Sequence, residues 1–432
     1  MNIKYKTLLI FSGLILGTVL AYLSGPSIET FGTDFTPSAP RGTSIRIPGN
    51  LCVDSLYINI DNKVESFLKQ WQIAGASVAI AHNEKMVFAK GFGWSDKEEQ
   101  LPVEPYNLFR IASVSKLITA TGIMKLVENG KLNLSDKVFG PNGILKSAPF
   151  DNYIDKNIED IQVLHLLNHS GGWTTRWGDP LFMPYSIARQ TGKTLPLNQD
   201  DIIEFMLGKR LHFKPGTASY YSNLGYVILG RVIETVTGQD YESYIKNAIL
   251  YPLDIYDMQI GGSFINERLP LEVKYYEPLD HIIVDDFCGL GEKVMGSYGG
   301  NDVRTLGAAG GWVASSTDLL KLLLALDGKP EPKDILSPES IRLMTTPSPV
   351  GHQPLGWRAV TSDSWYRTGT FAGTSAILVR QDDGISYVVL LNTNTWKGPG
   401  LSYEIRRMMN QAIKHTKEWT SDDLFNLAQY SN

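Results

Sequence analysis

The chain has 432 residues, of which 43% are hydrophobic and 20% are charged. This length and composition allow a large buried core and exclude an intrinsically disordered chain. The net charge is -5 at pH 7 and no basic tract is present, so nucleic acid is excluded as an expected partner.

Residues 1–25 have the composition of an export segment. Two lysines precede an apolar run that ends at a Ser-Gly-Pro turn. A basic start and such a run are typical of a signal peptide or of a single membrane anchor, the latter attaching the protein through residues 7–23. We therefore expect an exported protein, periplasmic or membrane-anchored and facing outward, with residues 26–50 as a linker.

Apolar patterns predict a helix and a hairpin near the start of the chain and three strands and a helix near its end. Between them, residues from about 113 to 326 are mostly helix and loop. We predict an α+β fold, an α/β sandwich with an inserted helical domain, in which one antiparallel sheet is built from about residues 72–95 and 355–415. The domain covers residues 51–420, and 421–432 form a C-terminal tail. The predicted elements are a helix over 60–71, strands over 75–82, 85–92, 364–369, 374–380 and 385–392, and a helix over 401–415.

Ser113-Val-Ser-Lys116 lies at the start of a segment with apolar residues at helical spacing, which ends at Gly130. Side chains three residues apart lie on one helical face, so this spacing places a nucleophile beside a possible proton acceptor, near the free N–H groups of a helix start. The alternative is an ordinary N-cap serine followed by a solvated lysine. Ser243 and Lys246 have the same spacing in an amphipathic helix, so the spacing alone is not specific.

Two other clusters carry polar groups suited to a cleft. Tyr221-Ser222-Asn223 follows a Pro-Gly turn, and alternate residues of an extended segment share a face, so Tyr221 and Asn223 can point into one cleft. The alternative is a tyrosine that packs the loop and an asparagine that caps the next helix. Arg367-Thr368-Gly369 lies on a predicted strand, where a glycine lets a ligand approach the backbone.

Together and in this order, the three clusters resemble the serine β-lactamase and penicillin-binding-protein superfamily, and most of all its class C β-lactamase-like branch of carboxypeptidases and esterases. The resemblance extends over about residues 54–415 and implies a β-lactamase/transpeptidase-like fold with no cofactor. Three more segments carry it, His165-Leu-Leu-Asn-His-Ser-Gly-Gly-Trp173, residues 310–319 and Leu355-Gly-Trp357.

The resemblance implies a role for each matched residue. Ser113 is the nucleophile that forms an acyl-enzyme, and Lys116 and Tyr221 handle its proton, with the choice of base between them left open. Asn223 would hydrogen-bond the substrate amide or orient Lys116. The backbone N–H groups of Ser113 and Thr370 would form the oxyanion hole.

Arg367 departs from the family pattern, which has Lys-Thr-Gly or His-Thr-Gly at this place. Arginine can grip a carboxylate with two parallel hydrogen bonds, but it cannot replace a group that gives up a proton. We expect Arg367, Thr368, Gly369 and Thr370 to bind substrate. The alternative is an arginine in a salt bridge that faces away from the site.

His165 and His169 have a spacing that helices use to bind zinc, but the glutamate of the His-Glu-x-x-His motif is missing, so we expect structural roles and no metal. Trp173, Trp177 and Tyr185 lie in an aromatic and proline-rich stretch that forms either an active-site rim or a packed loop. As rim residues they would contact the substrate.

The sequence therefore predicts an exported serine hydrolase that acts on carboxylate-terminated peptides or amides, D-alanyl peptides included, or on small esters. β-Lactam hydrolysis is a weaker expectation, because it requires fast deacylation. One alternative is a non-catalytic sensor that captures peptides or β-lactams, and another is a transacylase. A disulfide between Cys52 and Cys288 and the oligomeric state are left open.

Overall fold

The structure is a computed structural model that describes residues 44, 46–47, 55–278 and 283–427. The predicted export segment, most of the linker and Cys52 lie outside these residues. Among the residues described, no helix has the length and apolar character needed to span a membrane.

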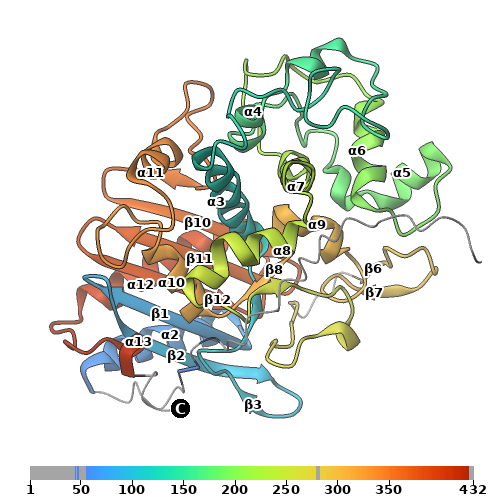
Figure 1. Ribbon diagram of the computed structural model, residues 1–432. Helices are drawn as coiled ribbons and strands as arrows, with labels where there is room; N and C mark the ends of the chain where they lie inside the picture. The colour runs from blue at the N-terminus through green and yellow to red at the C-terminus, as the bar shows by residue number, and fades with distance from the viewer. Residues whose placement is uncertain (1–43, 45, 48–54, 279–282, 428–432) are drawn as a thin grey trace, which may run out of the picture. The chain divides into compact units, whose positions relative to one another are not determined.

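A seven-stranded antiparallel sheet joins the two ends of the chain, in the order β3-β2-β1-β12-β11-β10-β9 (Figure 1). The central pairing of β1 with β12 brings together Val78 and Val389, which lie more than 300 residues apart in the sequence. The sheet prediction is confirmed, including both ends of the first strand. The strands are β1 (Gly75–His82), β2 (Lys85–Asp96), β3 (Leu101–Pro102), β9 (Ala359–Val360), β10 (Ser364–Phe371), β11 (Thr374–Gln381) and β12 (Ile385–Leu391).

Both faces of the sheet are covered, since every residue of β12 is buried. The helices α2 (Ile58–Trp71) and α12 (Leu401–Lys414) pack against each other, α2 on β2 and α12 on β11. The helix α10 (Ser316–Leu324) packs on β1 and β12. The C-terminal tail holds a short helix, α13 (Leu424–Leu427), that contacts β2.

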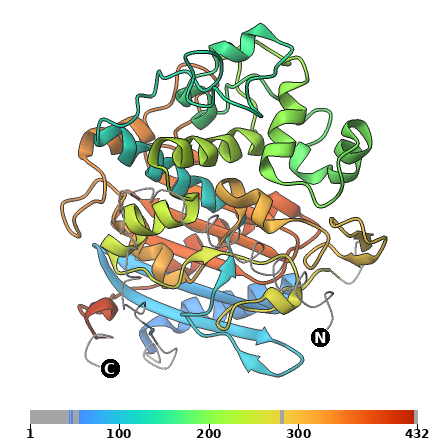
Figure 2. The ribbon, with the colours of Figure 1, turned by 45° about the vertical axis from the view of Figure 1, so that its right-hand side comes forward.

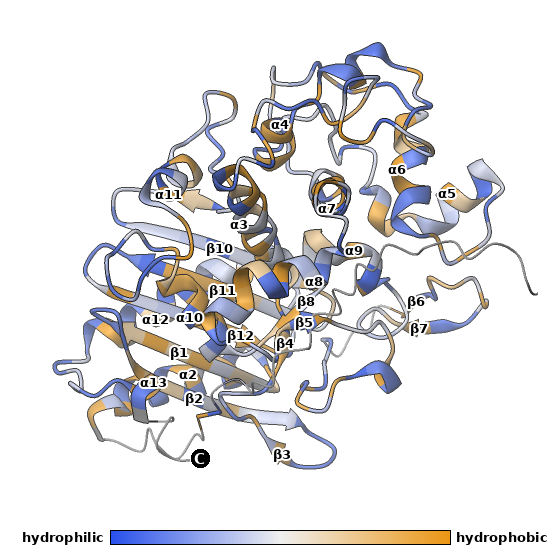
Figure 3. Cartoon of the chain, in the orientation of Figure 1, coloured by the Kyte–Doolittle hydropathy of each residue, from blue (hydrophilic) through white to orange (hydrophobic). Residues whose placement is uncertain are grey.

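The helical region lies on one side of the sheet (Figure 2). Its central helices α3 and α7 are buried along most of their length and carry the apolar colour in Figure 3. Its α-helices are α3 (Ser115–Glu128), α4 (Val163–Leu167), α5 (Pro184–Thr191), α6 (Gln199–Leu207), α7 (Asn223–Thr237), α8 (Tyr241–Ile245), α9 (Val303–Gly310) and α11 (Pro338–Thr345). Short strands are β4 (Phe109–Arg110), β5 (Gln259–Ile260), β6 (Ile283–Asp285), β7 (Lys293–Met295) and β8 (Trp312–Ala314).

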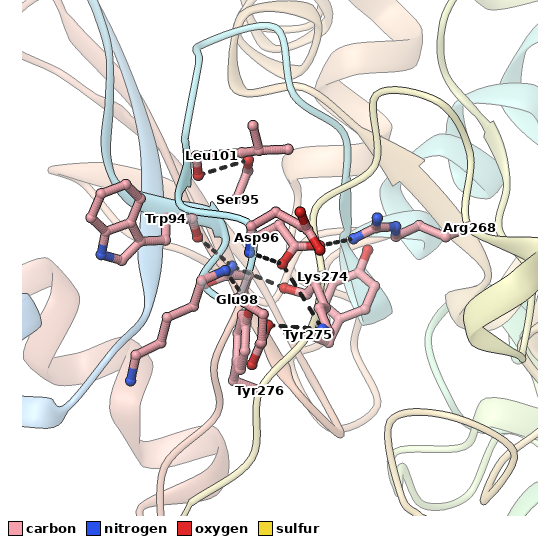
Figure 4. Close-up of polar contacts among 12 residues, drawn as sticks. Trp94, Ser95, Asp96, Glu98, Leu101, Arg268, Lys274, Tyr275 and Tyr276 are labelled. Carbon is pink, nitrogen blue, oxygen red and sulfur yellow. Dashed lines mark hydrogen bonds and ion pairs between the residues drawn. The ribbon is translucent and has the colours of Figure 1, made fainter.

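A polar cluster ties the end of β2 to the segment 268–276 (Figure 4). Asp96 pairs with Arg268 at 3.2 Å and with Lys274 at 3.9 Å. The next residue of this segment, Tyr275, accepts a hydrogen bond of 2.7 Å from the backbone N–H of Arg110. The cluster therefore helps to fix the stretch of chain that leads to Ser113.

Candidate active site

Ser113 lies in η3 (Ala112–Val114), a single 3-10 turn that leads directly into α3. The sequence prediction placed it in the first turn of the helix, whereas the structure places it just before. Ala112 has a positive φ of 46°, which is costly for a residue with a Cβ. Hydrogen bonds of the flanking residues hold this turn in place. One of them is donated by the Ile111 N–H to the Trp312 carbonyl at 3.0 Å.

Gly369 on β10 lets the strand pack backbone to backbone against this turn. A Cβ at position 369 would lie 2.1 Å from the carbonyl oxygen of Ile111 and 2.9 Å from the backbone nitrogen of Ser113. We expected the glycine to make room for a ligand. In the structure the turn that carries Ser113 occupies that space, and β10 is thereby held beside the nucleophile candidate.

Lys116 is fully buried, with 0% of its surface exposed, and its ammonium meets three acceptors. Nζ donates to the Ala309 carbonyl at 2.5 Å, to Asn223 Oδ1 at 2.7 Å and to Ser113 Oγ at 3.2 Å. The first two acceptors cannot donate, so they fix two N–H groups. The third position of Nζ therefore faces Ser113, as an N–H when Lys116 is charged or as a lone pair when it is neutral. Burial lowers the pKa of Lys116.

Tyr221 has its hydroxyl 2.6 Å from Ser113 Oγ, the shortest contact that this oxygen makes with the predicted proton-handling groups. Burial by itself raises the pKa of this phenol. The positive charges of Lys116 and Arg367, together with hydrogen bonding to Lys116 and Ser113, outweigh burial and lower the pKa to about 8. A phenolate is therefore within reach near neutral pH.

Arg367 faces Ser113 and is almost fully enclosed, with 2% of its surface exposed. Its Nε donates to the Ser113 carbonyl at 2.8 Å, and an Nη donates to the Tyr221 hydroxyl at 3.4 Å. The structure thus brings Arg367 into the cluster, where two of its guanidinium nitrogens already donate to protein oxygens. The guanidinium therefore places its positive charge beside Ser113 and Tyr221.

Asn223 contacts Lys116, as one of the two roles expected for it requires. Its Oδ1 accepts from Lys116 while its Nδ2 donates to Asp179 Oδ2 at 2.7 Å. A carboxylate can only accept, so Asp179 fixes which end of the amide faces the lysine.

Asp179 is a site residue that the sequence analysis missed. It precedes Pro180 and accepts from the Leu181 N–H at 3.1 Å, so its local pattern is that of an ordinary helix cap. Burial raises the pKa of its carboxyl. Only the fold, which brings this loop over the start of α7, reveals its contact with Asn223.

The two histidines have separate packing roles. His169 is buried with its ring centroid 4.8 Å from that of Tyr221, and it accepts from the Ser222 N–H at 3.3 Å. Burial and then the charges of Arg367 and Lys116 hold its pKa well below the usual range, so the imidazole is neutral. His165 Nδ1 accepts from the Gln162 N–H at 3.2 Å. No group of three or more potential metal ligands occurs within the described part of the chain.

A cavity of about 530 Å³ opens above Ser113. Tyr221, Asn223, Arg367, Thr368 and Thr370 contribute to its lining. The structure therefore brings these predicted side chains together with Ser113, while Lys116 and Gly369 contact Ser113 without lining the cavity.

The aromatic contacts predicted for the substrate are not found at the cavity. Trp173 is buried in the core, Trp177 is 69% exposed, and the Tyr185 hydroxyl is directed to Asp286. None of the three lines the cavity. Phe182 does so instead, because η5 (Pro180–Phe182) turns it toward Phe371, with ring centroids 6.2 Å apart.

The second Ser-x-x-Lys pair has no such environment. Lys246 Nζ pairs with Glu242 at 2.7 Å, and Ser243 takes part in the capping of α8 by Asp240. Neither residue lines the cavity above Ser113. The variant Ser243→Ala is therefore a matched control for Ser113→Ala.

Residues 60–407 match the family model described as Beta-lactamase, and the chain belongs to this family of β-lactamase-like serine hydrolases. The chain is 34% identical over 197 residues to Protein flp of Staphylococcus aureus (strain NCTC 8325 / PS 47), a match that covers 45% of this chain and 36% of that protein. It thus spans just over a third of the length of this curated relative.

Solved structures show the same fold. The octameric penicillin-binding protein homologue from Pyrococcus abyssi is 27% identical with a TM-score of 0.58, over 82% of this chain and 77% of that one. A D-amino acid amidase from Ochrobactrum anthropi SV3, complexed with L-phenylalanine, is 22% identical with a TM-score of 0.66, over 84% and 99%. The predicted β-lactamase/transpeptidase-like fold is confirmed.

Proposed function

We propose that this protein is an exported serine hydrolase that forms an acyl-enzyme on Ser113 and acts on amides or peptides that end in a carboxylate, or on small esters. The observation that carries the proposal is the position of Ser113 Oγ, 2.6 Å from Tyr221 and 3.2 Å from Lys116 at the floor of a cavity. Similarity to a penicillin-binding protein homologue supports a substrate with an amide bond and a terminal carboxylate.

In the proposed reaction Tyr221 takes the proton of Ser113. In the form of the site with Lys116 charged, Nζ donates to Ser113 Oγ, and the serine proton then points to the nearer oxygen, that of Tyr221. With a pKa of about 8, the phenolate is available near neutral pH, and Lys116 and Arg367 stabilise its charge. Arg367 thus serves the proton transfer without giving up a proton itself.

The bond changes follow from this arrangement. Ser113 Oγ bonds to the substrate carbonyl carbon as its proton passes to Tyr221, and the carbonyl oxygen becomes an oxyanion. The backbone N–H groups of Ser113 and Thr370 would stabilise it, since Ser113 lies in the 3-10 turn η3 that leads into α3, and N–H groups at such a start lack partners inside the helix. When this tetrahedral intermediate collapses, the bond to the leaving group breaks and the leaving group receives the proton from Tyr221. Water then hydrolyses the serine ester.

Steady-state hydrolysis of a chromogenic ester tests the proposal. Wild type and Ser243→Ala should turn over repeatedly, whereas Ser113→Ala should lose activity by at least about 1,000-fold, as expected when the nucleophile of a covalent mechanism is removed. Equal rates for wild type and Ser113→Ala would refute it. Adding an amine acceptor to the same assay detects transfer in place of hydrolysis.

A further inference from the structure

The outer face of α12 carries basic and aromatic side chains. Tyr403, Arg407 and Lys414 follow one another along it, four and then seven residues apart, and all three are exposed. Ile405 and Met409, on the other side of the helix, are buried. The helix therefore presents cations to solvent, although the net charge of the chain is -5.

A groove of about 600 Å³ follows this face of α12 and is lined also by Lys63 of the neighbouring helix α2. Its charged lining residues are Lys63, Arg406, Arg407 and Lys414, and no Asp or Glu lines it. Lys63 and Lys414 form no ion pair with any described residue. Since a cleft lined by one sign of charge concentrates ligands of the opposite sign, the groove favours anionic groups.

The carboxylates of the two helices do not neutralise this groove. Glu404 pairs with Arg407 at 2.8 Å and with Lys397 at 2.5 Å, so one carboxylate serves two cations. Asp61 is paired at 2.6 Å with a lysine of β2. Glu65 lies two positions after the groove lysine of α2, so its side chain points in another direction.

Two exposed aromatic side chains lie at the start of α12. Trp396 has 81% of its surface exposed, the largest fraction among the large hydrophobic side chains of the described residues, and Tyr403 is 67% exposed. The Trp396 ring centroid lies 6.2 Å from that of Trp71, and Lys397 Nζ lies 5.1 Å from the Trp71 ring and 5.6 Å from the Trp396 ring. Exposed Trp and Tyr beside cations are typical of surfaces that meet the headgroup region of a bilayer.

The same segment borders the active-site cavity. Pro399 and Ser402 line the cavity above Ser113, while Tyr403 and Arg406 line the groove. Both hollows therefore adjoin the first turn of α12, and a surface bound at the groove lies next to the mouth of the cavity.

We propose that this surface docks the protein on a bilayer of anionic lipid. The docking face consists of Lys63, Trp396, Tyr403, Arg407 and Lys414. Its cations match the charge of the headgroups, as in other basic segments that bind anionic lipid. A dissolved anion would also satisfy the cations but would leave Trp396 in water, whereas a bilayer accommodates both. The inference goes beyond the proposed function, because it places the cavity against a membrane surface and does not depend on the bond that Ser113 attacks.

Hydroxyl-radical footprinting of the full-length protein tests the docking face. The protein is mixed with vesicles of phosphatidylcholine alone or of phosphatidylcholine and phosphatidylglycerol in equal parts, and mass spectrometry measures the oxidation rate of each side chain. On the anionic vesicles, oxidation of Trp396 and Tyr403 should slow by at least about threefold relative to the neutral ones, as expected when a side chain leaves water for the headgroup region. Trp177 should keep its rate; it is 69% exposed, has the Arg176 guanidinium 5.1 Å from its ring and does not line the groove.

Two triple variants separate a specific face from general charge. The first replaces with glutamine the exposed cations of the docking face, Lys63, Arg407 and Lys414. The second replaces with glutamine exposed lysines of the helical region that do not line the groove, Lys131, Lys146 and Lys209. Each cation near an anionic surface strengthens binding by about fivefold, so the first variant should bind about 100-fold more weakly and lose the protection of Trp396. The second should keep that protection.

Three results would overturn the docking face. One is an oxidation rate of Trp396 in the wild type that is the same on both kinds of vesicle, and another is protection that survives in the first variant. The third is equal protection by soluble polyphosphate without vesicles, which would identify a site for a free polyanion. None of them bears on Ser113, whose role is tested by turnover.

Discussion

Replacing Arg367 with glutamine should move the pH dependence of activity to higher pH. Arg367 lies 3.4 Å from the Tyr221 hydroxyl and is one of two cations that lower the pKa of this phenol to about 8. Two unit charges about 4 Å apart interact by about 1 kcal/mol in water and about 4 kcal/mol at an effective dielectric constant of about 20. About 1.4 kcal/mol corresponds to one pKa unit.

Because the cavity opens to solvent, we expect the lower half of this range, a rise of about one to two units in the pKa of Tyr221. The phenolate is the proposed base, so activity is lost as the pH falls below its pKa. In Arg367→Gln the ascending limb of kcat/KM against pH should then shift by about one to two units, with a loss of about 10- to 100-fold at pH 7 and partial recovery at high pH.

The assay is the pH profile of kcat/KM for a neutral ester, measured beside Arg367→Lys. The lysine variant keeps the positive charge, so its profile should stay close to that of the wild type. An unchanged ascending limb in Arg367→Gln, with only a uniform loss of rate, would refute the electrostatic role assigned to Arg367 and the choice of Tyr221 as base.

Three further outcomes are expected. Asp179→Asn removes the fixed acceptor that orients Asn223, and should lower kcat by about 10-fold while KM for a neutral ester changes less than about twofold. Gly369→Ala places a Cβ 2.1 Å from the Ile111 carbonyl, so it should lower kcat/KM by at least about 100-fold in protein whose circular dichroism is native; near-wild-type activity would contradict the packing described. Burial raises the pKa of Asp318 to about 7, so the stability that its protonated form provides is present at low pH and is lost as the pH rises through about 7. Asp318→Asn cannot ionise, and its melting temperature relative to the wild type should rise between about pH 5 and about pH 8.5; a constant difference would argue against a buried ionising group.

The sheet could be predicted because its signals are local. Apolar runs and the Asn83-Glu84 turn mark the strands of the first hairpin, and both turn residues have the positive φ that such a turn requires. β10 runs two residues past its predicted end, to Phe371, because its hairpin turn is shorter than the loop allowed in the prediction.

The polar groups of the site were predictable to the extent that they lie in short motifs. Ser113, Lys116, Tyr221 and Asn223 are found together in the structure as their motifs predicted. Asp179 was not predicted as a site residue, because its sequence neighbours indicate a helix cap and its contact with Asn223 joins residues 44 positions apart. Such a contact exists only in the folded chain.

The side-chain directions of the two arginines and of the aromatic residues could likewise not be predicted from the sequence. Sequence could not tell that the Arg367 guanidinium turns inward onto Ser113, or that Arg358, in a segment noted only for its glycine and tryptophan, lies exposed at the cavity wall. Nor could it tell that Phe182 reaches the cavity while Trp177 points to solvent. Side-chain direction in a loop depends on turns such as η5, which composition does not encode.

The central claim is that Ser113 is the nucleophile of a serine hydrolase, and intact-protein mass spectrometry tests it most directly. The residues from 51 onward would be exposed to a fluorophosphonate and, separately, to a penicillin, beside Ser113→Ala and Ser243→Ala. We expect one adduct with the fluorophosphonate in the wild type and in Ser243→Ala and none in Ser113→Ala; a penicillin adduct that persists would identify slow deacylation. Folded wild-type protein that gains no mass from either reagent, or an adduct that survives in Ser113→Ala, would contradict the account.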